Sequence, residues 1–346
     1  PVAIFGMQEL AAMALQNGID WNSSKADWMS WAGIHNAHKL KKRFRSKCLK
    51  SGKAPILKEK VLKLKNNFAM TLAETIQLTT RNHLEENNGQ LFGQCVTAVG
   101  WIGGTVPEMT EAEGIVELSM ADVAGAGVAV GSALMGRRPI YVIRYQGFMW
   151  YNAAPILNYA AKSKDIWGVP CPLFVRSIAM EGHIGPVASA SHHGLVMRMP
   201  GMPVIAPMTP AEWLEGWRWF QEHDDPIYVS EHRRGFTVDY EMDDEVDGEA
   251  DITLIAISAA RLNAQDAIKQ LAEEGIRCHL IHAVWLKPFL IKESIQKSLD
   301  QTNLGLVIDS DFEMAAGGRS IAYELMHKTG HPVHALGLED RSAGFA

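Results

Sequence analysis

The stretch from Asp122 to Phe148 constrains the fold of this chain more than any other part of the sequence. It opens with a lone carboxylate and continues through small and apolar residues to the turn Gly136-Arg137-Arg138-Pro139. The predicted strand Ile140–Tyr145 follows and leads to Phe148 directly after a glycine. Small side chains let another backbone or a flat ligand approach closely. This order of carboxylate, tight helix, strand and aromatic ring predicts a site for one planar heterocycle.

Predicted strands and helices alternate on both sides of an acidic connector at residues 239–251. The predicted strands are 91–92, 116–118, 140–145, 172–176, 204–206, 226–229, 252–257, 278–282 and 305–309. The predicted helices, besides the small-residue helix after Asp122, are 71–83, 152–162, 212–222, 262–274, 292–299 and 318–329. Such alternation is typical of α/β proteins with parallel sheets. We therefore expect two consecutive parallel-sheet α/β domains, at residues 67–238 and 250–346.

Residues 1–66 form a separate N-terminal extension, which we expect to be helical and basic. Between His38 and Lys65 it carries twelve lysines and arginines against the single acid Glu59, although the whole chain has a net charge of −6. Surfaces of opposite charge indicate docking between subunits or an acidic partner. Trp28 and Trp31 would pack the extension onto the rest of the chain or onto a partner. A nucleic-acid-binding arm is an alternative, but no motif of a recognised module accompanies the charge, so we expect no nucleic-acid partner.

Length and cysteine usage indicate a globular protein of a reducing compartment. A chain of 346 residues can bury the cores of two domains. Its four cysteines are scattered and form no C-x-x-C pair, which favours free thiols. The longest apolar run, residues 123–135, is too short to cross a bilayer, and we see no signal-peptide pattern at the start. We expect a cytoplasmic protein with no membrane partner.

The Asp122–Phe148 stretch resembles the pyrimidine-binding half of thiamine-diphosphate enzymes. This family includes transketolase, deoxyxylulose-phosphate synthase and the beta subunits of 2-oxo-acid dehydrogenases. In its members a glutamate begins a small-residue helix, a Gly-x-(Arg/Lys)-Pro turn ends it, and a strand leads to a stacking phenylalanine. The resemblance covers about residues 68–346, because Gly317-Gly318 and the ending from Leu338 to Phe345 are similar to the transketolase C-terminal domain. It implies a pyrimidine-binding fold followed by a transketolase C-terminal-like domain.

The resemblance places Asp122 where the family has its glutamate, and Phe148 where the family stacks a ring on the aminopyrimidine. The carboxylate would hydrogen-bond the pyrimidine ring nitrogen and so favour the imino tautomer that removes the thiazolium proton. Aspartate is shorter than glutamate by about 1.5 Å, so the helix sits closer to the ring, a water intervenes, or activation is weaker. A plain helix N-cap is the alternative for Asp122, and a core aromatic is the alternative for Phe148. Gln94 matches an acidic position near the cofactor, where an amide cannot ionise.

Histidines and arginines provide candidates for contacts with the substrate. The predicted loop from Glu181 to Gly194 resembles the family's substrate loop, in which His192 or His193 would be catalytic, with His183 as a second candidate. A metal site or surface histidines are the alternatives. Arg198 and Arg234 resemble arginines that hold a substrate phosphate, although surface ion pairs explain them equally well.

The family binds the cofactor's diphosphate through a metal held by a Gly-Asp-Gly motif, which this sequence lacks. The resemblance therefore implies an alpha-type partner subunit that supplies the Gly-Asp-Gly motif and the Mg2+ ligands. We expect a heterotetramer with active sites at the subunit interfaces, and no metal ligands on this chain. The predicted function is that of the C-terminal-type (beta) subunit of a split, thiamine-diphosphate-dependent, transketolase-like enzyme. It would transfer a ketol or acyl unit from a ketose or 2-oxo acid.

Two alternatives remain open for the function. A 2-oxo-acid dehydrogenase E1 beta subunit would have the same fold and would also dock onto a lipoyl-bearing acyltransferase. A non-catalytic scaffold subunit would account for the aspartate at 122 and the amide at 94. Lipoamide-dependent turnover identifies the first, and the effect of restoring glutamate at position 122 tests the second.

Overall fold

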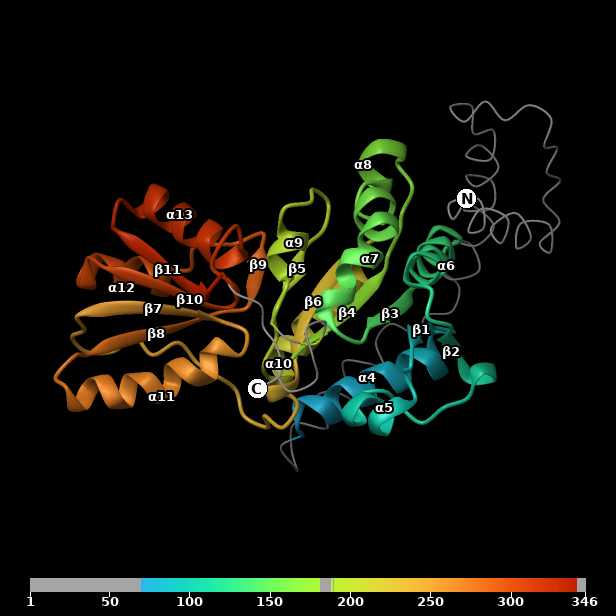
Figure 1. The fold of residues 1–346 in the computed structure, drawn as a ribbon, viewed down its shortest axis with the longest axis horizontal. Helices are drawn as coiled ribbons and strands as arrows, with labels where there is room; N and C mark the ends of the chain where they lie inside the picture. The colour runs from blue at the N-terminus through green and yellow to red at the C-terminus, as the bar shows by residue number, and fades with distance from the viewer. Residues whose placement is uncertain (1–69, 181–187, 189, 341–346) are drawn as a thin grey trace. The chain divides into compact units, whose positions relative to one another are not determined.

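The computed structural model describes residues 70–180, 188 and 190–340 (Figure 1). The chain divides into two units, Pro1–Ala69 and Met70–Ala346, and every described residue belongs to the second unit. The predictions for the basic N-terminal extension, for His183 and for the Asp-Arg ending after Asp340 lie outside the described residues.

The first half of the described chain forms most of a seven-stranded sheet, with the strand order β2-β1-β3-β4-β6-β5-β9. All neighbouring strands are parallel except β5 and β9, which are antiparallel. Its strands are β1 (Gln90–Gln94), β2 (Ile115–Leu118), β3 (Pro139–Ile143), β4 (Phe174–Ala179), β5 (Val204–Ile205), β6 (Ile227–His232) and β9 (Trp285–Lys287). The strand β9 comes from the second half of the chain, so the sheet is completed by a distant segment.

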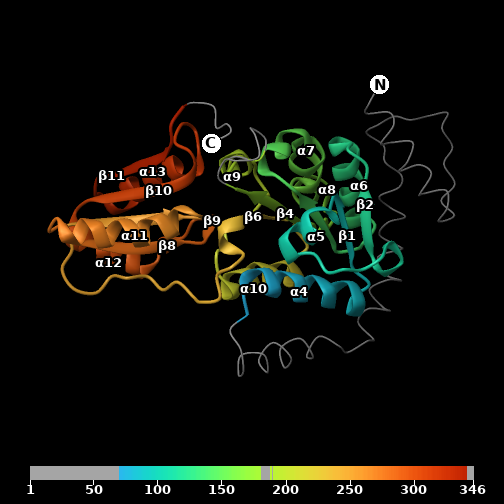
Figure 2. The ribbon, with the colours of Figure 1, turned by 60° about the horizontal axis from the view of Figure 1, so that its bottom comes forward.

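Helices cover both faces of this sheet, with α4 and α10 on one face and α6 and α7 on the other (Figure 2). The α-helices are α4 (Leu72–Glu86), α5 (Ala98–Gly104), α6 (Asp122–Leu134), α7 (Met149–Pro155), α8 (Ser163–Trp167), α9 (His193–Met197) and α10 (Pro210–Glu222). Short helical turns are η1 (Glu111–Glu113), η2 (Gln146–Phe148), η3 (Ile156–Ala160) and η4 (Arg233–Gly235). Burial on both faces explains why β3, β4 and β6 consist of buried residues throughout.

A four-stranded parallel sheet in the order β11-β10-β7-β8 forms the second half. Its strands are β7 (Ile252–Ile257), β8 (Cys278–Ala283), β10 (Gly305–Phe312) and β11 (Val333–Leu338). Its helices are α11 (Ala260–Glu273), α12 (Glu293–Thr302) and α13 (Gly317–Thr329). The helix α11 packs on one face of the sheet, and α12 and α13 pack on the other. The predicted fold class, two parallel-sheet α/β domains, is confirmed.

Local sequence explains where the two long helices on the sheet begin. The hydroxyl oxygen of Thr71 accepts from the backbone N–H of Glu74 at the start of α4. The carboxylate of Glu74 accepts from the backbone N–H of Thr71, which completes a capping box. Thr209 and Glu212 form the same box at the start of α10, where Pro210 occupies the first turn. Both boxes satisfy backbone N–H groups that a helix start leaves without partners.

One local prediction is wrong, one is refined, and two strands were missed. The predicted loop through Gly194 is wrong at its end, where the helix α9 begins at His193. This helix packs so closely that a Cβ on Gly194 would lie 2.9 Å from the Cα of Ala316. The predicted helix 152–162 is helical through Ala160, as the α-helix α7 to Pro155 and the π-helix η3 from Ile156, and Pro155 inside it cannot donate a helical hydrogen bond. The strands β9 and β11 were not predicted. Among the described residues no helix has the length and apolar character needed to cross a membrane.

Candidate functional site

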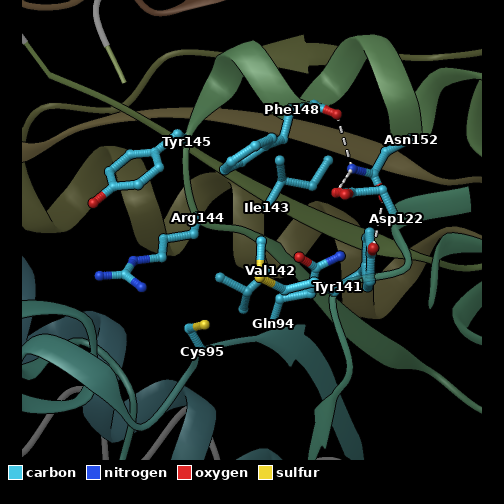
Figure 3. A pocket seen from close by; sticks show the side chains of 11 residues that line it. Gln94, Cys95, Asp122, Tyr141, Val142, Ile143, Arg144, Tyr145, Phe148 and Asn152 are labelled. Carbon is cyan, nitrogen blue, oxygen red and sulfur yellow. Dashed lines mark hydrogen bonds between the residues drawn. The ribbon is translucent and has the colours of Figure 1, made fainter. Parts of the chain in front are cut away.

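A small pocket lies at the carboxyl edge of the first sheet, where parallel α/β proteins commonly bind ligands (Figure 3). It brings together three predicted site residues: Gln94 from the end of β1, Asp122 from the start of α6, and Phe148 from η2 after β3. The rest of its lining is Cys95, Met120, Tyr141, Val142, Ile143, Arg144, Tyr145 and Asn152. The cavity measures about 120 Å³. An engineered protein cavity of about 150 Å³ holds benzene, so this somewhat smaller pocket is of the same order and can receive at most one small ring.

Asp122 is the first residue of α6, and its side chain does not cap the helix. The cap position belongs to Ala121, which makes no side-chain capping bond, so the N-cap alternative is wrong. Instead, the Nδ2 of Asn152 donates a hydrogen bond of 2.8 Å to Oδ1 of Asp122. Among the described residues the second oxygen, Oδ2, has no hydrogen-bond partner. Asp122 therefore retains one carboxylate oxygen that can hydrogen-bond a ligand.

Tyr141 and Asn152 lie behind this carboxylate, and sequence reasoning missed both. The Tyr141 hydroxyl donates to Oδ1 of Asn152 at 2.6 Å. Burial, together with the nearby charge of Asp122, raises the pKa of Tyr141, so the hydroxyl stays protonated and donates. A polar Asn152 in the apolar segment that follows β3 is the only sequence signal that pointed to this contact.

Phe148 lines the pocket, and its ring is near the rings of two tyrosines. Its ring centroid is 6.0 Å from that of Tyr145 and 6.5 Å from that of Tyr151, both in tilted arrangements. The side chain is only partly buried and packs at the edge of the core. A partly exposed aromatic ring beside a carboxylate is suited to stacking on a heterocycle, because aromatic rings prefer offset or tilted ring contacts.

Gln94 contributes a hydrogen-bond donor without a partner. Its Nε2 is buried and makes no hydrogen bond to any described residue. A buried amide N–H that lacks an acceptor is costly, and a ligand with an acceptor atom in this pocket would satisfy it. The preceding residue, Gly93, has to be small because a Cβ there would lie 2.6 Å from a methyl group of Val96.

Of the two described histidines predicted to be catalytic, His193 is fully buried. Its Nδ1 lies 3.1 Å from Oγ of Ser230 and its Nε2 lies 3.0 Å from the carboxylate of Asp309. Burial opposes protonation, but the charges of Asp309 and Asp311 outweigh it and raise the pKa of His193 to about 9. Because its ring is closed off from the pocket, the geometry argues against the predicted contact between His193 and substrate.

His192 remains the only candidate among the two adjacent histidines. Its backbone N–H donates to Oε1 of the buried Gln146 at 2.6 Å, and its ring lies 5.9 Å from that of Phe312. It does not line the pocket. The rings of His192 and His193 have different neighbours, which excludes chelation of one metal by the pair in this arrangement.

The two predicted anion-binding arginines do not line the pocket either. Arg198 is exposed at the end of α9, and Arg234 donates to Oδ1 of Asn263 at 2.6 Å beside a separate, open hollow. Sequence reasoning missed Arg144, which lines the pocket directly after β3 and lies 5.3 Å from the ring centroid of Tyr145. Its position after a fully buried strand was the signal that could have identified it.

Metal ligands are not gathered in the part of the chain that the structure describes. Over residues 70–180 and 190–340 no group of three or more His, Cys, Asp or Glu side chains is arranged to hold a metal ion. The cysteines Cys95, Cys171 and Cys278 are free thiols.

The fold and the pocket together define an α/β protein with a small pocket at the carboxyl edge of a parallel sheet. Residues 78–237 match the family model for the transketolase pyrimidine binding domain, and residues 244–345 match the model for the transketolase C-terminal domain. The chain belongs to the family of proteins that carry these two domains in succession. The resemblance seen in the sequence is therefore confirmed.

Several beta subunits are similar to this chain. The beta subunit of 2-oxoisovalerate dehydrogenase from Bacillus subtilis strain 168 is 25% identical over 264 residues, which cover 70% of this chain and 80% of the relative. The pyruvate dehydrogenase E1 beta subunit of Staphylococcus epidermidis is 23% identical and is covered over 85% of its length. The chain spans only 61% of a third relative, the beta subunit of acetoin:2,6-dichlorophenolindophenol oxidoreductase from Bacillus subtilis, at 25% identity.

Two solved structures share the fold. A split-gene transketolase, described as an inactive beta4 tetramer, matches with a TM-score of 0.61 at 18% identity, over 78% of this chain and 90% of that one. Transketolase from Campylobacter jejuni matches with a TM-score of 0.63 at 14% identity, over 89% of this chain and 49% of that one.

Proposed function

We propose that this chain is the beta-type subunit of a thiamine-diphosphate-dependent, transketolase-like enzyme and that it holds the aminopyrimidine ring of the cofactor. One observation carries the proposal: a single pocket of ring size collects Asp122, Phe148 and Gln94 from three separate segments. The matched pyrimidine binding domain covers all three residues. With its partner, the subunit would transfer a ketol or acyl unit from a ketose or 2-oxo acid.

The residues present fit an aminopyrimidine. The open oxygen of Asp122 would hold a proton shared with a ring nitrogen, within a heavy-atom distance of about 2.6–3.2 Å. The unsatisfied Nε2 of Gln94 would donate to a ring acceptor, and Phe148 would cover one face of the ring. When bound, thiamine diphosphate supplies a carbon nucleophile and an electron sink, and the protein supplies orientation and proton positions. For a proton transfer at the substrate, His192 and His183 remain the candidates on this chain.

Exposed apolar side chains beside the pocket support a partner subunit. Met120 at the pocket is 78% exposed and Trp150 on α7 is 62% exposed, with Val123 and Tyr151 exposed nearby. Contiguous exposed apolar surface marks interaction sites on soluble proteins. We propose that an alpha-type subunit covers this surface and supplies the Gly-Asp-Gly motif, the diphosphate site and the Mg2+ ligands. Two such pairs would form a heterotetramer.

The beta subunits among the relatives support a second candidate, the E1 beta subunit of a 2-oxo-acid dehydrogenase. The fold and the pocket are compatible with both. Lipoamide-dependent acyl transfer by the purified complex would identify the dehydrogenase, whereas ketol transfer between sugars would identify the transketolase-like enzyme. A scaffold subunit would show neither activity, and the substitution Asp122→Glu would not change its activity.

The cofactor test uses the chain in complex with the subunit that co-purifies with it. Titration of the complex with thiamine diphosphate and Mg2+ gives the dissociation constant for Asp122→Ala and Phe148→Ala. We expect each variant to bind at least about tenfold more weakly, because each removes a charged hydrogen bond or a stacking face. The control is Asp165→Asn, an exposed acid on α8, which should bind like the unmodified complex. Absence of thiamine diphosphate binding, or equal binding by Asp122→Ala, would contradict the proposal.

A further inference from the structure

Building on the proposed function, we infer that Asn152 and Tyr141 are positioning residues that fix the carboxylate of Asp122 and the backbone at Phe148 with one shared amide. The Nδ2 of Asn152 donates to Oδ1 of Asp122 at 2.8 Å and to the carbonyl oxygen of Phe148 at 2.9 Å. Its Oδ1 accepts from the hydroxyl of Tyr141 at 2.6 Å. The acid and the aromatic wall of the pocket are therefore held by the same side chain (Figure 3).

The chemistry of the groups fixes the direction of every hydrogen bond in this network. A carboxylate and a backbone carbonyl only accept, so both must face the NH2 group of Asn152. Its amide oxygen then has to face Tyr141, whose hydroxyl has to donate. Rotation of the amide by 180° would place its oxygen against two acceptor oxygens, which is unfavourable. The amide therefore has one favourable orientation.

Burial makes this orientation rigid. Asn152 and Tyr141 are each 1% exposed, so water does not compete for their hydrogen bonds. Tyr141 lies on β3, which pairs with β1 and β4, and Asn152 lies on α7, which packs against α6. The network thus ties Asp122 to the strand and to the neighbouring helix.

An aspartate in this position needs such support. Its carboxylate reaches about one methylene less far than a glutamate would, so a ligand bond depends on where α6 and the side-chain rotamer place it. Asn152 occupies Oδ1 and leaves Oδ2 as the oxygen available to a ligand. The network thereby selects which oxygen faces the pocket, and it keeps Phe148 at a fixed position relative to that oxygen.

A double-mutant cycle on the complex with its co-purifying subunit separates positioning from simple packing. Dissociation constants for thiamine diphosphate are measured for Asn152→Ala, Asp122→Ala and the double variant, together with the near-ultraviolet circular dichroism of the bound aminopyrimidine. We expect Asn152→Ala to bind about tenfold more weakly, and the double variant to lose less binding than the two single losses added together, because Asn152 acts partly through Asp122. The circular dichroism band should shrink in Asn152→Ala at saturating cofactor, which a purely structural role would not cause.

Tyr141→Phe is the second variant, because it removes one oxygen and keeps the ring that fills the core. This variant should weaken cofactor binding about threefold to fivefold, since the Asn152 amide loses the hydrogen bond from Tyr141 but keeps those to Asp122 and Phe148. The matched controls are Tyr228→Phe, another buried tyrosine of the sheet, and Asn158→Ala, an exposed asparagine on η3. Both controls should bind the cofactor like the unmodified complex.

The outcomes distinguish this inference from the proposed function. If Asp122→Ala weakens binding but Asn152→Ala does not, or if the two losses add in the double variant, the positioning role is wrong and the cofactor site stands. If the unmodified complex does not bind thiamine diphosphate, or if Asp122→Ala binds equally, both are overturned. A non-additive cycle with unchanged controls supports the positioning role.

Discussion

Position 122 shows what a single residue does and does not reveal about a site. An aspartate before a helix is a common N-cap, and residue type alone cannot separate a cap from a ligand-binding acid. The structure separates them, because Asp122 makes its hydrogen bond to Asn152 and none to the helix start. Asp122, Phe148 and Gln94 could be predicted to lie together, since each follows a strand that ends at the same sheet edge. Tyr141 and Asn152 could not, because their contact depends on how α7 packs against the sheet.

Gln94 provides a prediction in which stability and binding change in different directions. Its Nε2 is buried without an acceptor, so Gln94→Leu removes an unsatisfied donor while keeping much of the side-chain volume. We expect an unchanged or raised melting temperature, together with about threefold to tenfold weaker thiamine diphosphate binding by the complex. Differential scanning fluorimetry and cofactor titration measure the two quantities.

The matched control for Gln94→Leu is Gln221→Leu. Gln221 lies on α10 and also has a buried Nε2 without a partner, but it does not line the pocket. This variant should resemble Gln94→Leu in melting temperature and the unmodified complex in cofactor binding. Equal binding by Gln94→Leu would show that its amide does not contact the ligand.

At the scale of elements, the sequence predicted those helices and strands whose pattern is local. The buried run of β7, the alternating burial of β10 and the capping box of α10 correspond to patterns in the local sequence. The strand β9 has three residues and pairs antiparallel with a distant strand, so only tertiary contacts reveal it. The helix α9 has five residues in a segment rich in Gly, Ser and His, and its contacts with Asp309 and Asp311 come from β10. Short elements stabilised by distant residues carry little local signal.

The buried His193 gives α9 a pH-dependent attachment to β10. Its pKa in the folded chain is raised to about 9, above the ordinary value of 6.5, so the folded state binds its proton more tightly than the unfolded chain does. The stabilisation is fully present below about pH 6.5 and is lost as the pH rises through about 9. From pH 6.5 to 9.5 we expect the free energy of unfolding to fall by an amount on the order of 3 kcal/mol.

Denaturant unfolding of the unmodified chain and of two variants measures the free energy of unfolding across this pH range. In His193→Gln the fall between pH 6.5 and 9.5 should disappear, since the titrating group is gone. In His334→Gln, which removes an exposed histidine of β11, the fall should remain. A fall that persists unchanged in His193→Gln would show that another group titrates.

At the scale of the whole molecule, the proposed function makes this chain one side of a site shared with a partner subunit. Its pocket offers an acid, an aromatic face and an amide donor, and exposed apolar side chains such as Met120 and Trp150 lie beside it. The sequence lacks the Gly-Asp-Gly motif, so the diphosphate end of the cofactor needs another polypeptide in this account. The two-domain order could be predicted from the alternation of strands and helices and from the Asp122–Phe148 stretch. The substrate could not be predicted, because the arginines expected to bind its anionic group, Arg198 and Arg234, do not line the pocket, whereas Arg144 does.

The most direct measurement is an experimental structure of the complex of this chain and its partner with thiamine diphosphate and Mg2+. We predict that an oxygen of Asp122 lies within about 2.6–3.2 Å of a pyrimidine ring nitrogen, with Phe148 against the ring and the diphosphate on the partner subunit. A cofactor bound elsewhere, or an Asp122 side chain turned away from the pyrimidine, would contradict the account.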